Sequence, residues 1–289
     1  MLTQRLSSNI STLLVCRSAA ARRLTPSATR IRWKSTSAES PDDLTNNSTK
    51  LAEATLKRFW KTVDIERRGD SFAVTLDKRA LKTPGGQTLL LPLNKALPAS
   101  LIAAEWDLQE TLIKPHALPM TSIVSRAVDT MRDEATRTEV REALLKYFDT
   151  DTVCFFHDSP EPLERLQSEH WTPLIEWTRK TFDVKINVSN SILSADQPPE
   201  TREKFGKLLE TFDEWEMAAM ERAVLATKSF ITALAVVKKH LTVEEAARVA
   251  SVEVDSQIER WGEVEDTHDV DYQDVRRQLG SAACLLSTV

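Results

Sequence analysis

Glycine is scarce in this sequence, and the loops that most often bind phosphate groups are missing. Only six of the 289 residues are Gly, and none lies between Gln87 and Phe205. Neither GxGxxG nor GxxxxGK followed by Ser or Thr occurs, which excludes the two common nucleotide-binding loops. The three cysteines, Cys16, Cys154 and Cys284, share no CxxC spacing, so a cysteine-rich zinc site is not expected. The scarcity of glycine also favours helices over a β fold rich in turns.

Acidic side chains are absent from the first 38 residues. This segment holds seven Lys or Arg, twelve Ser or Thr, and apolar residues at helical spacing. Such a composition is typical of a mitochondrial transit peptide, so we expect residues 1–38 to direct the protein to the mitochondrial matrix. A disordered basic tail is the alternative. The rest of the chain holds 31 of the 38 basic residues and all 43 acidic ones, a net charge of −12. That charge argues against a nucleic-acid partner.

Long hydrophobic runs are missing as well. The most apolar stretch, residues 218–237, is interrupted by Glu221, Arg222 and Lys228. A membrane-spanning helix needs about twenty predominantly apolar residues. We therefore expect no membrane insertion and a soluble mature protein.

Strand patterns are confined to a short N-terminal part of the mature chain. Residues 39–57 are polar and predict a linker. Residues 58–115 contain four short alternating or β-rich segments separated by turns, and then a helix from Pro98 to about Ile113. We predict a β-rich N-terminal domain with its helix over residues 58–115.

Helical patterns fill almost all of residues 116–289. Thr242 with Glu245 three residues later is a capping-box signature, and it predicts a helix that ends near Trp261. A short strand is expected only at 184–188. The fold class predicted is α+β: a small N-terminal antiparallel β unit followed by a larger α-helical domain, an orthogonal bundle, over residues 116–289.

The helix predicted from Pro98 to Ile113 carries a carboxylate on its apolar side. Glu105 and Gln109 lie one turn apart inside an apolar stripe that includes Leu108, and Trp106 lies at its edge. Two interpretations stay open. Trp106 can be a partner-binding anchor beside Glu105, or the pair can be a structural hydrogen bond beside a core tryptophan, since a buried carboxylate needs a partner.

The helix predicted from 242 to 261 repeats this arrangement inside an acidic region. Residues 244–274 contain eleven acidic residues and two Arg. The predicted apolar face of the helix includes Val254 and Trp261, with Glu253 at its border and Asp255 pointing away. The region is either a docking surface for a basic partner or a solvated helix face.

One cluster of polar residues suggests an enzyme or a metal-binding protein instead. Asp151, Cys154 and His157 lie close in sequence, and a thiolate beside an imidazole can act as a nucleophile or bind a metal. The neighbouring apolar residues, however, predict a buried Cys154, which would be a small hydrophobic residue. No other ligands follow at a recognisable spacing, and no small-molecule substrate is indicated.

Several short motifs along residues 58–286 resemble the Atp-twelve family of mitochondrial ATP synthase assembly chaperones. Their order and spacing carry the resemblance more than any single motif. The family-like segments are Arg58–Lys61, Val74–Pro84, Ala104–Asp107 with Gln109, Leu118–Thr121, Tyr147, Asp149–Cys154, Gln167, Trp171–Pro173, Gln257–Glu265 and His268–Asp269. At Val254, relatives can carry an acidic residue.

The resemblance implies a function by contact alone. Members of this family bind the free α subunit of the synthase's catalytic head, cover the surface that later meets the β subunit, and use no cofactor or ATP hydrolysis. It implies that the chain is not an enzyme. The candidate partner-binding residues are therefore Glu105, Trp106, Glu253, Asp255 and Trp261.

Overall fold

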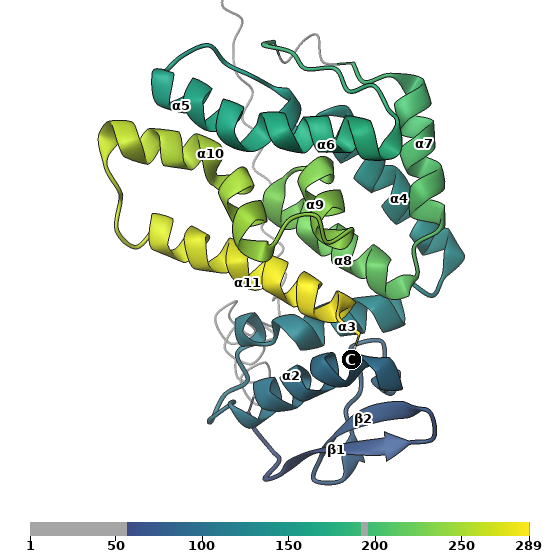
Figure 1. The fold of residues 1–289 in the computed structure, drawn as a ribbon. Helices are drawn as coiled ribbons and strands as arrows, with labels where there is room; N and C mark the ends of the chain where they lie inside the picture. The colour runs from purple at the N-terminus through teal and green to yellow at the C-terminus, as the bar shows by residue number, and fades with distance from the viewer. Residues whose placement is uncertain (1–56, 192–195, 289) are drawn as a thin grey trace, which may run out of the picture. The chain divides into compact units, whose positions relative to one another are not determined.

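The computed structural model describes residues 57–191 and 196–288 (Figure 1). The predicted transit peptide and all but the last residue of the predicted linker lie outside the described residues. The α-helices are α2 (Ala96–Asp107), α3 (Pro119–Asp129), α4 (Glu134–Asp149), α5 (Glu161–Leu166), α6 (Thr172–Phe182), α7 (Pro199–Glu210), α8 (Glu214–Thr227), α9 (Phe230–Val237), α10 (Val243–Trp261) and α11 (His268–Leu286).

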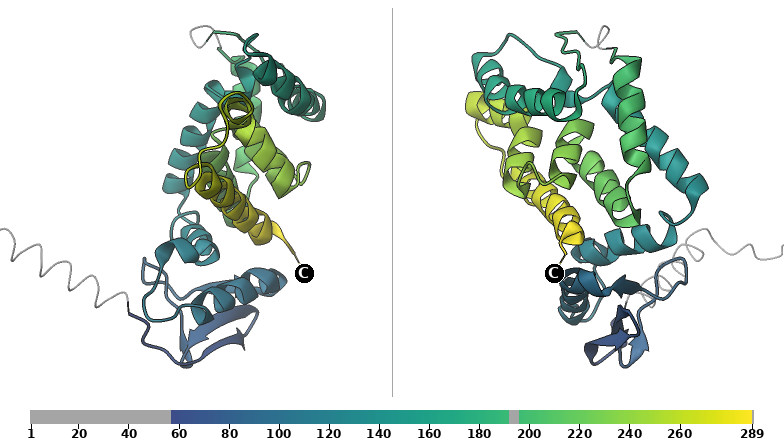
Figure 2. Two further views of the ribbon diagram at one scale, coloured as in Figure 1. Left: turned by 90° about the vertical axis from the view of Figure 1, so that its left-hand side faces the viewer. Right: turned by 45° about the vertical axis from the view of Figure 1, so that its right-hand side comes forward.

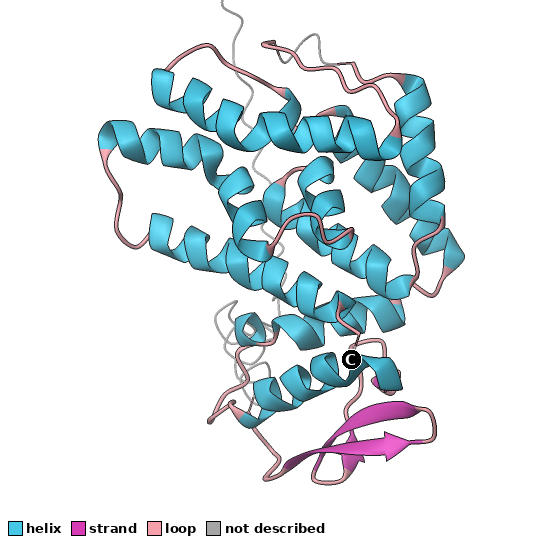
Figure 3. Ribbon diagram, in the orientation of Figure 1, coloured by secondary structure: helices cyan, strands magenta, loops and turns pink. Residues whose placement is uncertain are grey.

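The strands gather at one end, as Figure 3 shows, and form a small antiparallel sheet. They are β1 (Val63–Arg68), β2 (Ser71–Leu76), β3 (Arg79–Ala80) and β4 (Leu90–Pro92). Strand β2 is central, because it pairs with β1 through the register Ile65↔Val74, with β3 and with β4. Its last four residues are buried and α2 packs on the sheet, which gives the small sheet the apolar cover it needs.

Helix α2 is shorter than the sequence predicted. It ends at Asp107, and the predicted apolar stripe does not continue, since Leu108 is 78% exposed and Leu112 is 47% exposed. Residues 57 and 58 instead pair with the chain near Leu112, and Arg58 N donates to Thr111 O at 3.0 Å. The chain after Asp107 is therefore a loop that is hydrogen-bonded to the segment leading into the sheet.

Helices α8 and α9 form the centre of the helical part. All eight residues of α9, Phe230–Val237, are buried, and α8 packs against α3, α9 and α11. Helices α5 and α6 join through a π-helical turn at Gln167–Trp171, so two predicted helices are one continuous element. The strand expected at 184–188 is absent, and only a single bridge, Phe155↔Ser189, forms nearby.

Helix α10 begins and ends where its sequence indicated. The capping box of Thr242 and Glu245 is present, and the helix ends at Trp261 before Gly262, whose φ is +87°. Its buried face was wrongly predicted, because Val254 is 39% exposed and Trp261 is 70% exposed. The face that packs in the core is formed by Ala246, Ala247, Val249, Val252 and Ser256.

The predicted α+β fold class is confirmed, with a small antiparallel sheet before a larger helical part. In the two views of Figure 2, α10 and α11 keep their place beside each other, in agreement with their contacts. None of the helices that the structure describes is long and apolar enough to cross a bilayer.

Candidate partner-binding site

Three separate places hold the five residues predicted for partner binding. Glu105 and Trp106 lie where the end of α2 meets the start of α3, Glu253 and Trp261 line one hollow on α10, and Asp255 lines a different one. The structure thus places Glu253 with Trp261 and separates both from Asp255, which the spacing of these residues in the sequence did not show.

The Glu105 carboxylate holds the first turn of α3. Its oxygens accept from Met120 N at 2.6 Å, from Thr121 N at 2.9 Å and from Thr121 Oγ1 at 2.7 Å. An anion here satisfies free backbone N–H groups at a helix start and interacts favourably with the helix dipole. Burial raises the pKa of the Glu105 carboxyl, and the hydrogen bonds from Thr121 and Met120 oppose that rise.

Trp106 is half-buried, and its side chain contacts other residues of the chain. Its Nε1 donates to Thr121 Oγ1 at 3.0 Å, and its ring lies 4.9 Å from that of Trp60, centroid to centroid. Trp60 Nε1 in turn donates to the Trp106 carbonyl at 3.3 Å. Both Glu105 and Trp106 are therefore bonded across the contact of α2 with α3, while their role in partner binding stays a prediction.

Glu253 and Trp261 are both exposed and border the same hollow of about 300 Å³. Arg260 lies over the Trp261 ring at 5.0 Å from its centroid. The carboxylate of Glu253 makes no ion pair with any described residue. An exposed indole beside a free carboxylate is suited to contact a partner that is apolar and basic.

Asp255 lies on the other side of α10. Its carboxylate accepts from Ser251 Oγ at 2.8 Å, and it borders a groove of about 530 Å³ between α10 and α11. Arg276 pairs with Glu244 across the same helices at 2.8 Å. Asp255 is thus half-buried and partly satisfied, whereas Glu253 is free.

Sequence analysis missed the apolar residues that lie among the acids beyond Trp261. Val264 is 57% exposed, Val270 is 63% exposed and Tyr272 is 51% exposed. We name residues 253–274, from the second half of α10 to the start of α11, the acidic hairpin. Its apolar residues alternate with Asp and Glu in the sequence. This alternation could have indicated an exposed apolar and acidic surface, but such spacing is also common in ordinary helix faces.

Two of the three residues of the alternative catalytic cluster, Asp151 and Cys154, are buried in the core. Cys154 is fully buried, and burial raises the pKa of its thiol well above the usual range, so it is not a thiolate at neutral pH. Asp151 is fully buried and accepts from Val153 N at 3.2 Å and from Ile231 N at 2.8 Å, whereas His157 is exposed. Across 57–191 and 196–288, no group of His, Cys, Asp and Glu could hold a metal ion.

Comparison with known proteins places this fold in a family. The family model described as ATP12 chaperone protein matches residues 57–179. The chain is 35% identical to the mitochondrial protein atp12 of Schizosaccharomyces pombe over 253 residues, which cover 83% of this chain and 86% of that protein. The chain belongs to the ATP12 chaperone family. It is also 31% identical to mitochondrial ATP12 of Saccharomyces cerevisiae over 280 residues, again 83% of this chain and 86% of that protein.

A solved ATP12 structure shares the same fold. The chain superposes on Atp12 from Paracoccus denitrificans with a TM-score of 0.70 at 28% identity, over 81% of this chain and 98% of that one. The family resemblance that the sequence motifs indicated is therefore confirmed, and with it a chaperone function. Both fungal ATP12 relatives are named mitochondrial, and we assign the chain to the mitochondrion.

Proposed function

We propose that this ATP12-family chain is an assembly chaperone for the catalytic head of ATP synthase in the mitochondrial matrix. It binds the unassembled α subunit, keeps that subunit from aggregating, and is displaced by the β subunit. It uses no cofactor and catalyses no reaction. The observation that best supports a contact surface is the acidic hairpin, where Trp261 is 70% exposed beside the free carboxylate of Glu253.

The physical demands on such a chaperone agree with this surface. An unassembled subunit exposes an apolar interface, and stable interfaces of this kind bury about 1,200–2,000 Å². An exposed aromatic side chain ringed by charged groups can contact that interface and exclude water. A partner that binds the same interface with more contact area can then displace the chaperone.

Glu253, Asp255 and Trp261 are proposed as direct contacts with the α subunit. Glu105 and Trp106, which the sequence also suggested, are proposed to act by holding α2 on α3, because their polar groups are already bonded internally. A variant at these two positions is then expected to lose binding only through loss of structure.

Co-expression tests the proposal directly. The full chain is produced together with the free α subunit, and the soluble fraction is analysed for α and for a stable complex at moderate salt. We expect α to be soluble with the chain and to aggregate without it, and the β subunit to release it. Insoluble α and no complex in the presence of the folded chain would contradict the proposed function.

A further inference from the structure

A groove lies between the β-rich end and the helical part. It has a volume of about 910 Å³ and is bordered by residues 82–84, α3, α8 and the side chain of Gln278 on α11. Figure 1 shows α3 between α2 and the helices α8 and α11. Its size is that of clefts that hold small organic ligands, so it accommodates a few residues of an extended peptide.

Both acidic residues that border this groove are bonded within the chain. Asp129 accepts from Thr83 Oγ1 at 2.5 Å and from Gly85 N at 2.8 Å. Glu221 is held in a two-point ion pair with Arg126, with Nε–Oε2 and Nη2–Oε1 distances of 2.9 and 2.8 Å. Glu221 is therefore neutralised by Arg126, whereas Asp129, whose donors are uncharged, keeps its negative charge near Thr83 and Gly85.

Arg222 borders the same groove without a carboxylate partner. Among the described residues its guanidinium donates one hydrogen bond, to Ser122 Oγ at 2.9 Å. The neighbouring Asp274 is bonded to Arg277 and accepts from Gln278 Nε2 at 2.6 Å. Burial lowers the pKa of Arg222, as does the positive charge of Arg277, while Glu221 and Asp274 oppose the shift.

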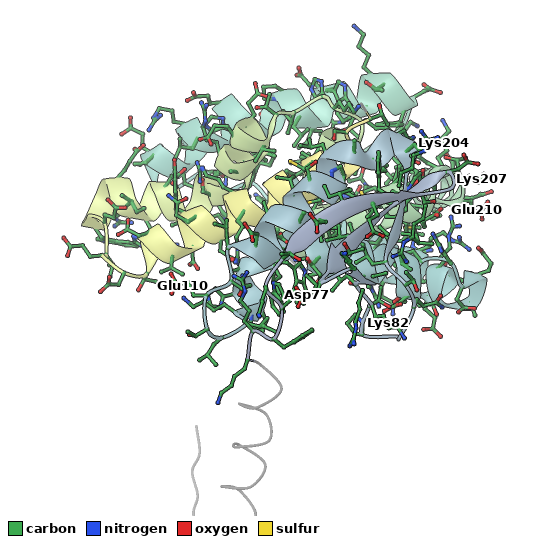
Figure 4. The ribbon with its side chains drawn as sticks, turned by 90° about the horizontal axis from the view of Figure 1, so that it is seen from below. Asp77, Lys82, Glu110, Lys204, Lys207 and Glu210 are labelled. Carbon is green, nitrogen blue, oxygen red and sulfur yellow. The ribbon has the colours of Figure 1, made fainter. Side chains whose placement is uncertain are left out.

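A second cation and apolar walls complete the groove. Lys82 is exposed and projects from the β-rich end in Figure 4, and it makes no ion pair with the residues described. Leu225, which is 46% exposed, and Leu118 supply apolar surface. Besides the charged Asp129, the groove therefore offers Arg222 and Lys82, which form no ion pair with described residues, beside apolar side chains.

We propose that this groove binds an extended segment of the client α subunit through an Asp or Glu side chain held by Arg222 and Lys82. Apolar neighbours of that acidic residue pack on Leu118 and Leu225. The inference rests on the proposed function, and adds a second contact that is opposite in charge to the acidic hairpin.

A carboxylate suits Arg222 for geometric reasons. A guanidinium presents a planar set of N–H donors that matches a carboxylate at two points, and hydrogen bonds between ionised groups are the stronger ones. A half-buried cation with one neutral partner has already lost part of its hydration, so little further desolvation opposes binding. An acidic residue of the client would restore the missing interaction.

Binding of peptides from the α subunit tests this inference. Fluorescein-labelled 12-residue peptides that overlap along the whole α subunit are titrated with the full chain, and fluorescence anisotropy gives each dissociation constant. We expect at least one peptide containing Asp or Glu to bind. Replacing that residue in the peptide by Asn or Gln is expected to weaken binding by about tenfold or more, because a charged hydrogen bond is lost.

Variants of the chain locate the contact. Arg222→Gln and Lys82→Gln are expected to weaken binding of the acidic peptide, and Arg222→Gln is expected to raise its dissociation constant about tenfold or more. The matched control is Arg79→Gln, an exposed arginine on β3 that forms no ion pair with described residues and does not border the groove, and it should bind as the unmodified chain does. Circular dichroism melting checks that all three variants fold.

A charge swap and competition by inorganic phosphate complete the test. Arg222→Glu should restore binding of a peptide whose acidic residue is replaced by Lys. The inference would be overturned if an acidic peptide bound all variants of the chain equally. It would also be overturned if inorganic phosphate displaced the peptide while replacing the peptide's acidic residue by Gln did not weaken its binding. If intact α subunit binds but no acidic peptide does, the groove inference fails alone. If intact α does not bind, the proposed function fails.

Discussion

Buried carboxylates in this acidic protein serve to join segments that are distant in sequence. Glu105 at the end of α2 accepts from the backbone of Met120 and Thr121, and Asp151 accepts from Ile231 N, 80 residues away. Each satisfies N–H groups at the start of a helix, where no carbonyl of the same helix can reach. Single side chains thus decide how the helices meet.

Trp106→Arg is expected to harm the protein through its stability. The substitution removes the ring packed on Trp60, breaks the hydrogen bond to Thr121 and places a charge in a half-buried site. We expect the free energy of unfolding to fall by about 2–4 kcal/mol, measured by urea denaturation. Trp106→Phe, which keeps a ring and loses the N–H, should cost about 1 kcal/mol. Unchanged stability for Trp106→Arg would identify Trp106 as a surface contact.

Asp151 makes stability depend on pH in a specific direction. Burial raises its pKa from the usual 3.8 to about 6, against hydrogen bonds from Ile231, Ser229 and Val153. Between these two pKa values the folded chain binds more protons than the unfolded chain, so this group's contribution is full below pH 3.8 and is lost as pH rises through 6.

Comparison with Asp151→Asn isolates that contribution. The variant cannot titrate here, so from pH 4 to 7 the unmodified chain should lose about 2 kcal/mol of unfolding free energy relative to it. Urea denaturation at several pH values measures the difference. A difference that is flat across this range, or that changes in the opposite direction, would show that Asp151 is not shifted upward.

At the scale of elements, the starts of α10 and α11 differ in how they are capped. Thr242 Oγ1 accepts from Glu245 N at 3.2 Å, and Glu245 accepts in return from Thr242 N at 2.8 Å. Thr267 stands at the start of α11 without any side-chain hydrogen bond to the helix. The two threonines provide a matched pair in one molecule.

Thr242→Ala is expected to lower the free energy of unfolding by about 1 kcal/mol, because the N–H of Glu245 at the start of α10 loses its side-chain acceptor. Thr267→Ala is the control and should change stability by a few tenths of a kcal/mol at most, about the size of an ordinary surface substitution. Denaturation of both variants in urea gives the comparison. Equal losses would mean that the capping box does not stabilise α10.

At the scale of the whole described chain, the two proposed contact surfaces carry opposite charges. The acidic hairpin presents Glu253 and Trp261, whereas the groove beside α3 and α8 presents Lys82 and Arg222. Opposite charges on two surfaces fix the orientation of a bound partner more firmly than one surface alone. An α subunit bound at both surfaces would have a defined orientation on the chaperone, and its exposed interface would be covered.

Charge reversal tests the acidic hairpin. Glu253→Lys is expected to weaken binding of the α subunit about threefold to tenfold with little change in melting temperature, since the carboxylate is free and exposed. Asp255→Lys should weaken binding too, with some loss of stability from the broken Ser251 contact. Glu176→Lys on α6, exposed and without an ion pair to described residues, is the control. Surface plasmon resonance at two salt concentrations measures the effect, and unchanged binding by both reversals would exclude the acidic hairpin.

Local sequence patterns determined the kind of elements and several of their ends. Capping at Thr242, the stop before Gly262 and the presence of a strand at β2 depend on neighbours within a few residues, so they could be predicted from sequence. The order of the motifs also determined the family. Helix α2 was overextended, because nothing within its own sequence showed that the chain after Asp107 pairs with residues 57 and 58.

Only the tertiary structure decided which faces and side chains are free. Val254 and Trp261 follow an apolar periodicity, yet no other element in the described part of the chain covers them, while Ser256 on the same helix is buried. Likewise, the isolated charge of Arg222 depends on Glu221 and Asp274 being bonded elsewhere. Burial and charge compensation are set by residues far apart in the chain, whereas helix and strand formation is set by near neighbours. The sequence by itself therefore determined the fold class and family, and the packing decided the surfaces available to a partner.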